Sequence, residues 1–205
     1  SRGLGDVYKR QMLDLQAFVR RVKSGEGPRE ALEKMVEQSS EQITQIFLSD
    51  KYDPVKSAQA WELIELLSKQ SVVHFEHVVF KNLFKAAPET CITELENSGL
   101  ITVARNRGVP CEIQPAKPMF RAAFQFLVND PELSTILRTR YLLKVVGFET
   151  NRIKKWEEEL RPLGKSGETK LFKDRLNYLS KKIEISNAII NDCESEIKNL
   201  AQKKK

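Results

Sequence analysis

Residues 172–200, FKDRLNYLSKKIEISNAIINDCESEIKNL, carry the most regular pattern in the chain. Apolar or small residues recur there at alternating spacings of four and three, which is the heptad pattern of coiled-coil helices. Lysine and glutamate lie between them, as a solvated helix surface requires. The pattern predicts one long helix with a coiled-coil seam made of Phe172, Leu176, Leu179, Ile183, Ser186, Ile190, Cys193, Ile197 and Leu200.

Such a seam needs an apolar partner, because an isolated helix would expose it to water. A predicted helix over residues 131–161 precedes it and carries its own apolar stripe, with Glu149 as the break. The connector between the two helices is short, which favours an antiparallel hairpin. Self-association between two chains is the alternative. The stripe of the earlier helix consists of Leu142, Val146, Ile153, Trp156, Leu160 and Leu163.

The segment over residues 12–70 predicts a helical, lid-like bundle. Pro28 opens one helix at its first turn, where the missing N–H is not needed. Asp53 and Pro54 form a second start signal, an N-cap followed by a proline. The stripe Leu32, Met35, Val36, Ile43, Ile46 and Phe47 gives the helix after Pro28 one apolar side.

The segment over residues 71–129 predicts a winged-helix module with a β-hairpin. Short helices are expected over 74–84 and 88–98, with Gly99 just past the end of the second. Alternating residues then predict a strand over 100–106 and a returning strand over 111–114. With the terminal hairpin over residues 130–205, the predicted fold class is mainly α.

The composition limits the functions that the chain can have. It has 205 residues, 40% hydrophobic and 30% charged, which is typical of a folded, helix-rich protein. No run of 18 apolar residues and no secretory h-region occurs, so the sequence predicts neither a membrane span nor a signal peptide within it. Three scattered cysteines are too few for a disulfide framework.

Residues 1–11 are predicted to be a remnant of library preparation rather than native protein. Asp6–Gln11, DVYKRQ, corresponds to the translated end of a transposase-based sequencing adaptor. Such remnants are excluded from fold reasoning. The segment holds Arg2, Lys9, Arg10 and Asp6, so the formal charge of +6 owes two units to it. The body of the chain is therefore nearly neutral, which weakens any inference of nucleic-acid binding.

The predicted recognition helix argues against readout of duplex DNA. Residues 88–98 carry Glu89, Glu94 and Glu96 and neither lysine nor arginine, so this helix would be repelled by phosphate. Arg105 and Arg107, in the predicted wing, are candidate phosphate contacts, but positioning contacts specify no sequence. A nucleic-acid-binding winged helix is therefore the alternative function, and binding of nucleic acid by this chain is not expected.

No catalytic, cofactor-binding or metal-binding residues are predicted. Gly164-Lys165-Ser166 resembles the end of a phosphate-binding loop, but Glu159 stands where that motif needs glycine. His74, His77 and the cysteines lack the spacing of a structural zinc site. No nucleophile with a base partner is recognisable. We therefore expect no enzyme activity from this chain.

Several stretches resemble the C-terminal region of the mitochondrial escape protein 2 family. They include DLQAFVRRVKSG at 14–25, IQPAKPMFRAAF at 113–124 and IKKWEEEL at 153–160. Ala116 stands where family members have glycine, and Gln11 stands where an arginine is expected.

The resemblance implies a larger parent protein of the mitochondrial inner membrane, with one membrane span outside this chain. It implies an RNA-recognition-type domain before that span, an ATPase-like P-loop domain after it, and a part in maintaining mitochondrial DNA nucleoids. ATP is thus implied for the parent alone. By the same resemblance, this chain would act as a soluble lid and interaction region. Its expected partners are the parent's nucleotide-binding domain, a second copy, or another coiled-coil protein.

Overall fold

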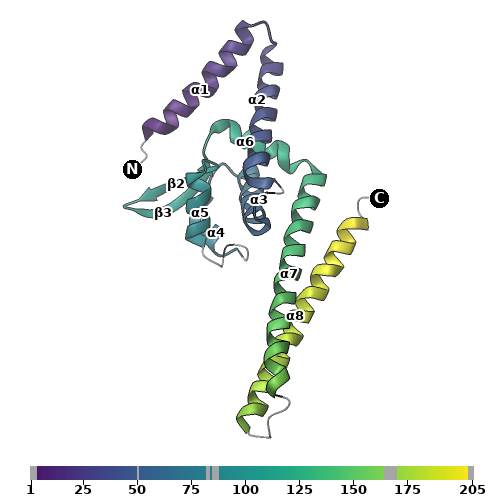
Figure 1. Ribbon diagram of the computed structural model, residues 1–205. Helices are drawn as coiled ribbons and strands as arrows, with labels where there is room; N and C mark the ends of the chain where they lie inside the picture. Colours follow the sequence, from purple (N-terminus) through teal and green to yellow (C-terminus); the bar gives the residue numbers. More distant parts are fainter. Residues whose placement is uncertain (1–3, 50, 82–83, 85–87, 164–169, 203–205) are drawn as a thin grey trace. The chain divides into compact units, whose positions relative to one another are not determined.

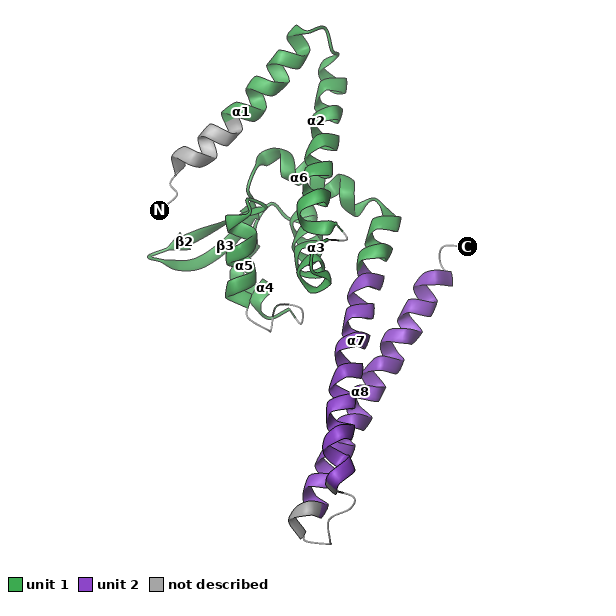
Figure 2. Cartoon of the chain, viewed as in Figure 1, with its two compact units in different colours: residues 1–137 green, residues 138–205 purple. Residues whose placement is uncertain are grey.

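The structure, a computed structural model, describes residues 4–49, 51–81, 84, 88–163 and 170–202. Side chains are described within these ranges except at 4–11, 163 and 170–172. The chain is mainly helical, with a small antiparallel sheet and two long terminal helices (Figure 1). It forms two compact units, residues 1–137 and residues 138–205, which Figure 2 colours separately. The predicted fold class is therefore confirmed.

The first unit begins with helices α1 (Leu4–Lys23) and α2 (Pro28–Ile43). A short π-helical turn, η1 (Thr44–Leu48), continues α2, and α3 (Pro54–Lys69) follows. As predicted, the Asp53 carboxylate caps α3: Oδ1 accepts from the backbone N–H of Val55 at 2.9 Å and of Lys56 at 3.3 Å. This capping supplies partners for amides that lack one inside the helix. The predicted library remnant at 1–11 runs into α1, whose backbone is described from Leu4.

A three-stranded antiparallel sheet follows, in the order β1-β3-β2. The helices α4 (Phe75–Val79) and α5 (Pro88–Asn97) lie between β1 (Val73–His74) and β2 (Ile101–Asn106) in the chain. Strand β3 (Val109–Pro115) returns beside β2. After β1, two short helices and then two strands follow in the order predicted for residues 74–114.

The predicted helix over 74–84 was wrong in its extent. His74 lies in β1, where it pairs with Glu112 of β3, and α4 ends at Val79. A strand of only two residues leaves no periodicity in the sequence, and it is held by pairing with a segment about 40 positions away, beyond the reach of a local pattern.

Helix α6 (Pro118–Val128) completes the core of the first unit together with the start of α7 (Pro131–Leu163). One hydrophobic cluster extends from Ile43 to Leu137. It contains residues from both sides of the predicted boundary at residue 70, so the lid-like bundle and the module after it share a core. The largest fully buried members include Phe84, Phe124, Leu63 and Ile113.

The second unit consists of the rest of α7 and of α8 (Lys170–Gln202). Each helix has 33 residues, which corresponds to about 50 Å of length. Asp130 caps the start of α7 as Asp53 caps α3, accepting from the backbone N–H of Glu132 at 2.9 Å. Repeating the cap-and-proline signal therefore produces the same helix start twice.

Candidate interaction surfaces

The coiled-coil seam of α8 is buried most deeply at every seventh residue. Leu179 is 0% exposed, Ser186 1% and Cys193 9%. Leu176, at the open edge of the seam, is 37% exposed. The Phe172 side chain lies outside the described residues. The remaining predicted members are half-buried: Ile183, Ile190, Ile197 and Leu200.

Three contacts establish that α7 and α8 run antiparallel within one chain. Arg138 Nε lies 2.7 Å from Glu196 Oε1, and Arg175 Nη2 lies 2.6 Å from Glu159 Oε1. Between these two pairs, Ser186 Oγ donates to Glu149 Oε2 at 2.5 Å. The partner number on α8 falls as the number on α7 rises, so the predicted hairpin is confirmed.

The polar residue in the apolar stripe of α7, Glu149, contacts the polar residue in the seam of α8, Ser186. Glu149 is 5% exposed, and its second carboxylate oxygen, Oε1, accepts from Arg152 Nη1 at 2.8 Å. Both oxygens of this buried carboxylate thus have partners, as a buried charge requires. A single polar contact inside an apolar seam fixes the register of two helices, because any shift leaves the polar group unpaired. The sequence marked Glu149 as a break and placed Ser186 in the seam, but it did not indicate that the two residues pair.

The first unit carries an apolar groove of about 540 Å³ between α1, α2 and α6. Its lining includes Leu15 and Phe18 of α1, Leu32 and Met35 of α2, and Met119 of α6. Leu15 is 55% exposed and Leu32 47% exposed. The sequence placed Leu32 in the apolar stripe of its helix, and the structure places Leu32 and Leu15 at the edge of this open groove. Adjoining apolar side chains of this size, left in water, are typical of surfaces that bind another molecule.

The acidic helix α5 uses two of its carboxylates inside the unit. Glu96 Oε1 accepts from Arg105 Nη1 at 2.9 Å, and Glu96 Oε2 from Arg105 Nη2 at 2.5 Å. Glu94 lies 2.6 Å from Lys56 Nζ of α3. Arg105, a candidate phosphate contact, would have to leave this bidentate pair to bind phosphate. Arg107 is exposed in the turn between β2 and β3, with φ of 50°.

The remaining candidate groups do not assemble into a reactive site in the described part of the chain. The rings of His74 and His77 are 5.6 Å apart. No group of three or more histidine, cysteine, aspartate or glutamate side chains gathers among the described residues. Burial, with a smaller effect of Glu94, raises the pKa of the Cys91 thiol to about 11, which keeps it protonated and unreactive at neutral pH. Gly164, Lys165 and Ser166 lie outside the described residues.

These features define a mainly helical protein in which a small sheet and a shared core precede a terminal helical hairpin. The chain belongs to the family described as RNA12 protein, whose model matches residues 8–166. No solved structure matches the chain. No helix within the described ranges has the length and apolar character needed to cross a membrane.

Curated relatives named "Mitochondrial escape protein 2" match almost the whole chain. The protein from Vanderwaltozyma polyspora is 72% identical over 194 residues, which cover 95% of this chain and 23% of the relative. The protein from Saccharomyces cerevisiae strain S288c is 71% identical over 192 residues, 94% of this chain and 23% of the relative. The protein from Scheffersomyces stipitis is 41% identical over 94% of this chain. The chain thus spans about a quarter of the length of these relatives.

Proposed function

We propose that this chain is a non-catalytic lid and interaction region of a larger mitochondrial protein. In this proposal, the apolar groove between α1, α2 and α6 is where the chain seats against another part of the same polypeptide. That part is a nucleotide-binding domain, and any ATP is bound there rather than by this chain. The observation that carries the proposal is the groove itself, with Leu15 and Leu32 about half exposed.

The size of the relatives supports this assignment. They extend over about four times the length of this chain, so most of their sequence lies outside it. A segment of the same polypeptide is held at high effective concentration by its covalent connection, so even a modest apolar contact would stay closed. The apolar lining favours a protein surface as occupant.

The similarity to relatives named "Mitochondrial escape protein 2" supports the biological role that we propose. We place the larger protein in the mitochondrion, at the inner membrane, and assign it to the maintenance of mitochondrial DNA nucleoids. In that role this chain contributes contacts rather than chemistry. The proposal needs no reactive group from the chain.

Hydrogen exchange on the whole polypeptide tests the groove. Amides of α1 and α2 should exchange more slowly in the whole protein than in the isolated chain, because the groove is then covered. Leu32→Glu should abolish this difference. Val109→Glu is the matched control, since Val109 is 66% exposed in β3 and does not line the groove. Equal exchange of α1 and α2 in both proteins would contradict the proposal.

Binding of nucleic acid is the second candidate, and it rests on the exposed Arg107 in the turn of the β-hairpin. Two features disfavour this candidate: α5 carries acidic side chains, which repel phosphate, and Arg105 is already paired with Glu96. Titration with a labelled duplex DNA at low and moderate salt decides between them. Tight binding that weakens with salt and is lost in Arg107→Ala would favour the second candidate.

A further inference from the structure

The terminal hairpin carries a second apolar strip beside its seam. On α7 the strip consists of Tyr141, Val145 and Phe148, and on α8 of Tyr178, Ile185 and Ile189. Phe148 is 60% exposed, Tyr178 51% and Ile185 50%. Tyr141 and Phe148 are seven residues apart, as are Tyr178 and Ile185, so each pair occupies one line along its helix. We call these six residues the aromatic flank.

Contacts of the three aromatic rings, together with the heptad spacing of Val145, Ile185 and Ile189, place the six residues on the same side of the hairpin. The pairs Arg138–Glu196 and Glu159–Arg175 join one edge of α7 to one edge of α8. On that edge the Arg138 guanidinium lies 5.5 Å from the Tyr141 ring centroid, and that of Arg175 lies 5.2 Å from Tyr178. The aromatic rings therefore lie beside the ion pairs that link the helices.

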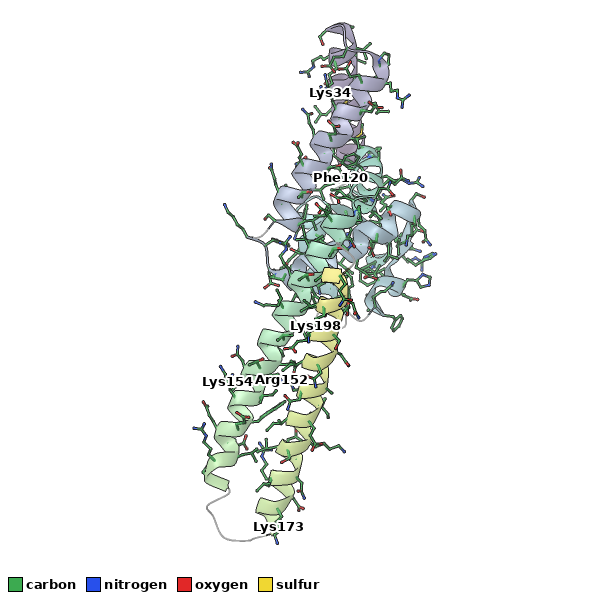
Figure 3. All side chains as sticks on the ribbon, turned by 90° about the vertical axis from the view of Figure 1, so that its right-hand side faces the viewer. Lys34, Phe120, Arg152, Lys154, Lys173 and Lys198 are labelled. Atoms are coloured by element: carbon green, nitrogen blue, oxygen red, sulfur yellow. The ribbon has the colours of Figure 1, made fainter. Side chains whose placement is uncertain are left out.

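Arg152 occupies the middle of the same edge. Its guanidinium lies 5.5 Å from the Phe148 ring centroid and 4.8 Å from that of Trp156. Figure 3 shows Arg152 midway along the hairpin, on the part of α7 that accompanies α8. The carboxylate that Arg152 contacts belongs to Glu149, which is buried in the seam. At the aromatic flank, the Arg152 guanidinium is therefore accessible to solvent, whereas the Glu149 carboxylate that it contacts is not.

The opposite edge of the hairpin has a different character. Leu143 is 56% exposed there, and heptad spacing aligns it with Thr150 and Glu157 on α7. The corresponding line of α8 holds Ser180, Asn187 and Glu194. Within the hairpin, apolar side chains are thus concentrated on the aromatic flank, and Leu143 provides an exposed leucine away from it for comparison. Ile136, seven residues before Leu143 and 40% exposed, belongs to the first unit.

Charge on the aromatic flank is positive in its middle section. Arg152, Lys155 and Lys182 lie along this section, and Lys182 Nζ is 5.6 Å from the Tyr178 ring centroid. In the described stretches 141–155 and 178–192, the carboxylates are Glu149, which is buried, Glu184, which heptad spacing places away from this flank, and Asp192, which lies in line with Ile185 at the end of the flank, outside its middle section. The complementary surface is therefore apolar with acidic borders.

We propose that the aromatic flank binds an amphipathic helix whose apolar stripe is bordered by aspartate or glutamate, which adds a third helix to the hairpin. The section from Tyr141 to Lys155 rises about 20 Å, which accommodates a helix of about four turns. This deepens the proposed function by naming a surface and a partner chemistry on the second unit, and it rests on the assignment of the chain as an interaction region.

Charge excludes a second copy of the same flank as the occupant. Two copies facing each other would bring Arg152 and Lys182 of both together without carboxylates between them, and like charges oppose each other. Single-stranded nucleic acid is disfavoured because bases stack on open aromatic faces. Here cations lie over the rings of Tyr141, Phe148 and Tyr178, and the neighbouring Ile185 and Ile189 are aliphatic.

The test uses the whole chain and two synthetic peptides of about four helical turns. Both peptides carry the same leucine stripe, bordered by glutamate in one and by lysine in the other. Fluorescence anisotropy should show binding of the glutamate peptide and at least about tenfold weaker binding of the lysine peptide. The double variant F148A/I185A should weaken binding of the glutamate peptide at least about tenfold, while circular dichroism stays unchanged. The matched control L143A should bind the glutamate peptide as the unmodified chain does.

Each other result counts against the proposal. Failure to bind the glutamate peptide, equal binding of both peptides, or equal weakening in L143A overturns it. A dimer in sedimentation that F148A/I185A dissociates makes a second copy the occupant. A labelled single-stranded RNA that the same variant releases makes nucleic acid the occupant. The groove variant Leu32→Glu should leave peptide binding unchanged, so failure here is distinct from failure of the proposed function.

Discussion

The two units of this chain bury their apolar residues in different ways. The first unit gathers side chains from helices and strands into one buried cluster, to which Phe84, Leu63 and Phe124 belong. In the second unit, the described residues that are both hydrophobic and buried are Leu142, Leu179 and Cys193, spread along two helices. A core fixes its elements by shape, whereas a seam repeats and admits shifted alignments. The seam therefore needs a polar contact to fix its register.

The largest effect is expected from truncation inside the core of the first unit. Phe124→Ala should destabilise that unit by about 3–5 kcal/mol, because it removes a fully buried ring and leaves a cavity. Denaturant unfolding followed by circular dichroism measures this. The control is Phe126→Ala, two residues further along α6, where the ring is 53% exposed. Similar losses in both variants would mean that α6 does not pack as described.

Truncation of the seam should cost somewhat less and should remain local. Leu179→Ala should destabilise the hairpin by about 2–5 kcal/mol, since the side chain is fully buried between α7 and α8. Hydrogen exchange should rise in residues 138–202 and stay unchanged in the first unit. If amides of the first unit also lost protection, the division into two units would be wrong. Tyr178→Ala, one residue away and half exposed, is the control for this measurement.

Variants of the contact between Glu149 and Ser186 should affect the stability of the hairpin and the register of its two helices differently. Ser186→Ala should cost about 1–3 kcal/mol, because it removes one partner of a buried carboxylate. The double variant Glu149→Leu/Ser186→Ala should recover most of that loss, since an apolar pair needs no partners. Its register should become less specific, which disulfide trapping between engineered cysteines on α7 and α8 would detect. A single trapped register in the double variant would assign register to the ion pairs instead.

The smallest effect is expected from the ion pair between Arg138 and Glu196. The hydrogen bond from Arg138 holds the pKa of Glu196 below its ordinary value of 4.5. A carboxyl whose pKa is lowered by folding contributes stability above its unfolded pKa, and this contribution is lost as the pH falls through the folded pKa. Because both side chains are more than 40% exposed, Glu196→Gln should cost only about 0.2–1 kcal/mol at pH 7. Unfolding at pH 7 and pH 3 tests this: the difference between variant and parent should be smaller at pH 3 than at pH 7.

Local signals in the sequence predicted most helix starts correctly. Asp53-Pro54 predicted the start of α3, and the same combination at Asp130-Pro131 begins α7, because an N-cap and a proline act within one helical turn. Gly99, with φ of 80°, closes α5 as expected of a residue without a Cβ. The two-residue β1 was not predicted, since it exists only through pairing with β3.

The candidate surfaces were predictable only in part. The heptad pattern placed the three most deeply buried residues of α8, Leu179, Ser186 and Cys193, in the predicted seam, but each helix pattern is independent of the other and contains no register. The contact of Glu149 with Ser186 therefore followed only from the structure. Part of the aromatic flank is recognisable in the sequence, because Tyr178 and Ile185 are seven residues apart. That spacing becomes meaningful once the position of α7 beside α8 is known.

Two of the three cysteines, Cys91 and Cys193, also provide a natural readout of local opening. Cys193 lies within the seam of the hairpin, whereas Cys91 packs against the core of the first unit. Burial raises the pKa of both thiols, so neither should be alkylated quickly while its surroundings stay closed. The alkylation rate of Cys193 thus reports how often the hairpin opens. The alkylation rate of Cys91 reports opening of the first unit separately. Opening of each unit can therefore be followed through a native cysteine, without introducing a label site by mutation.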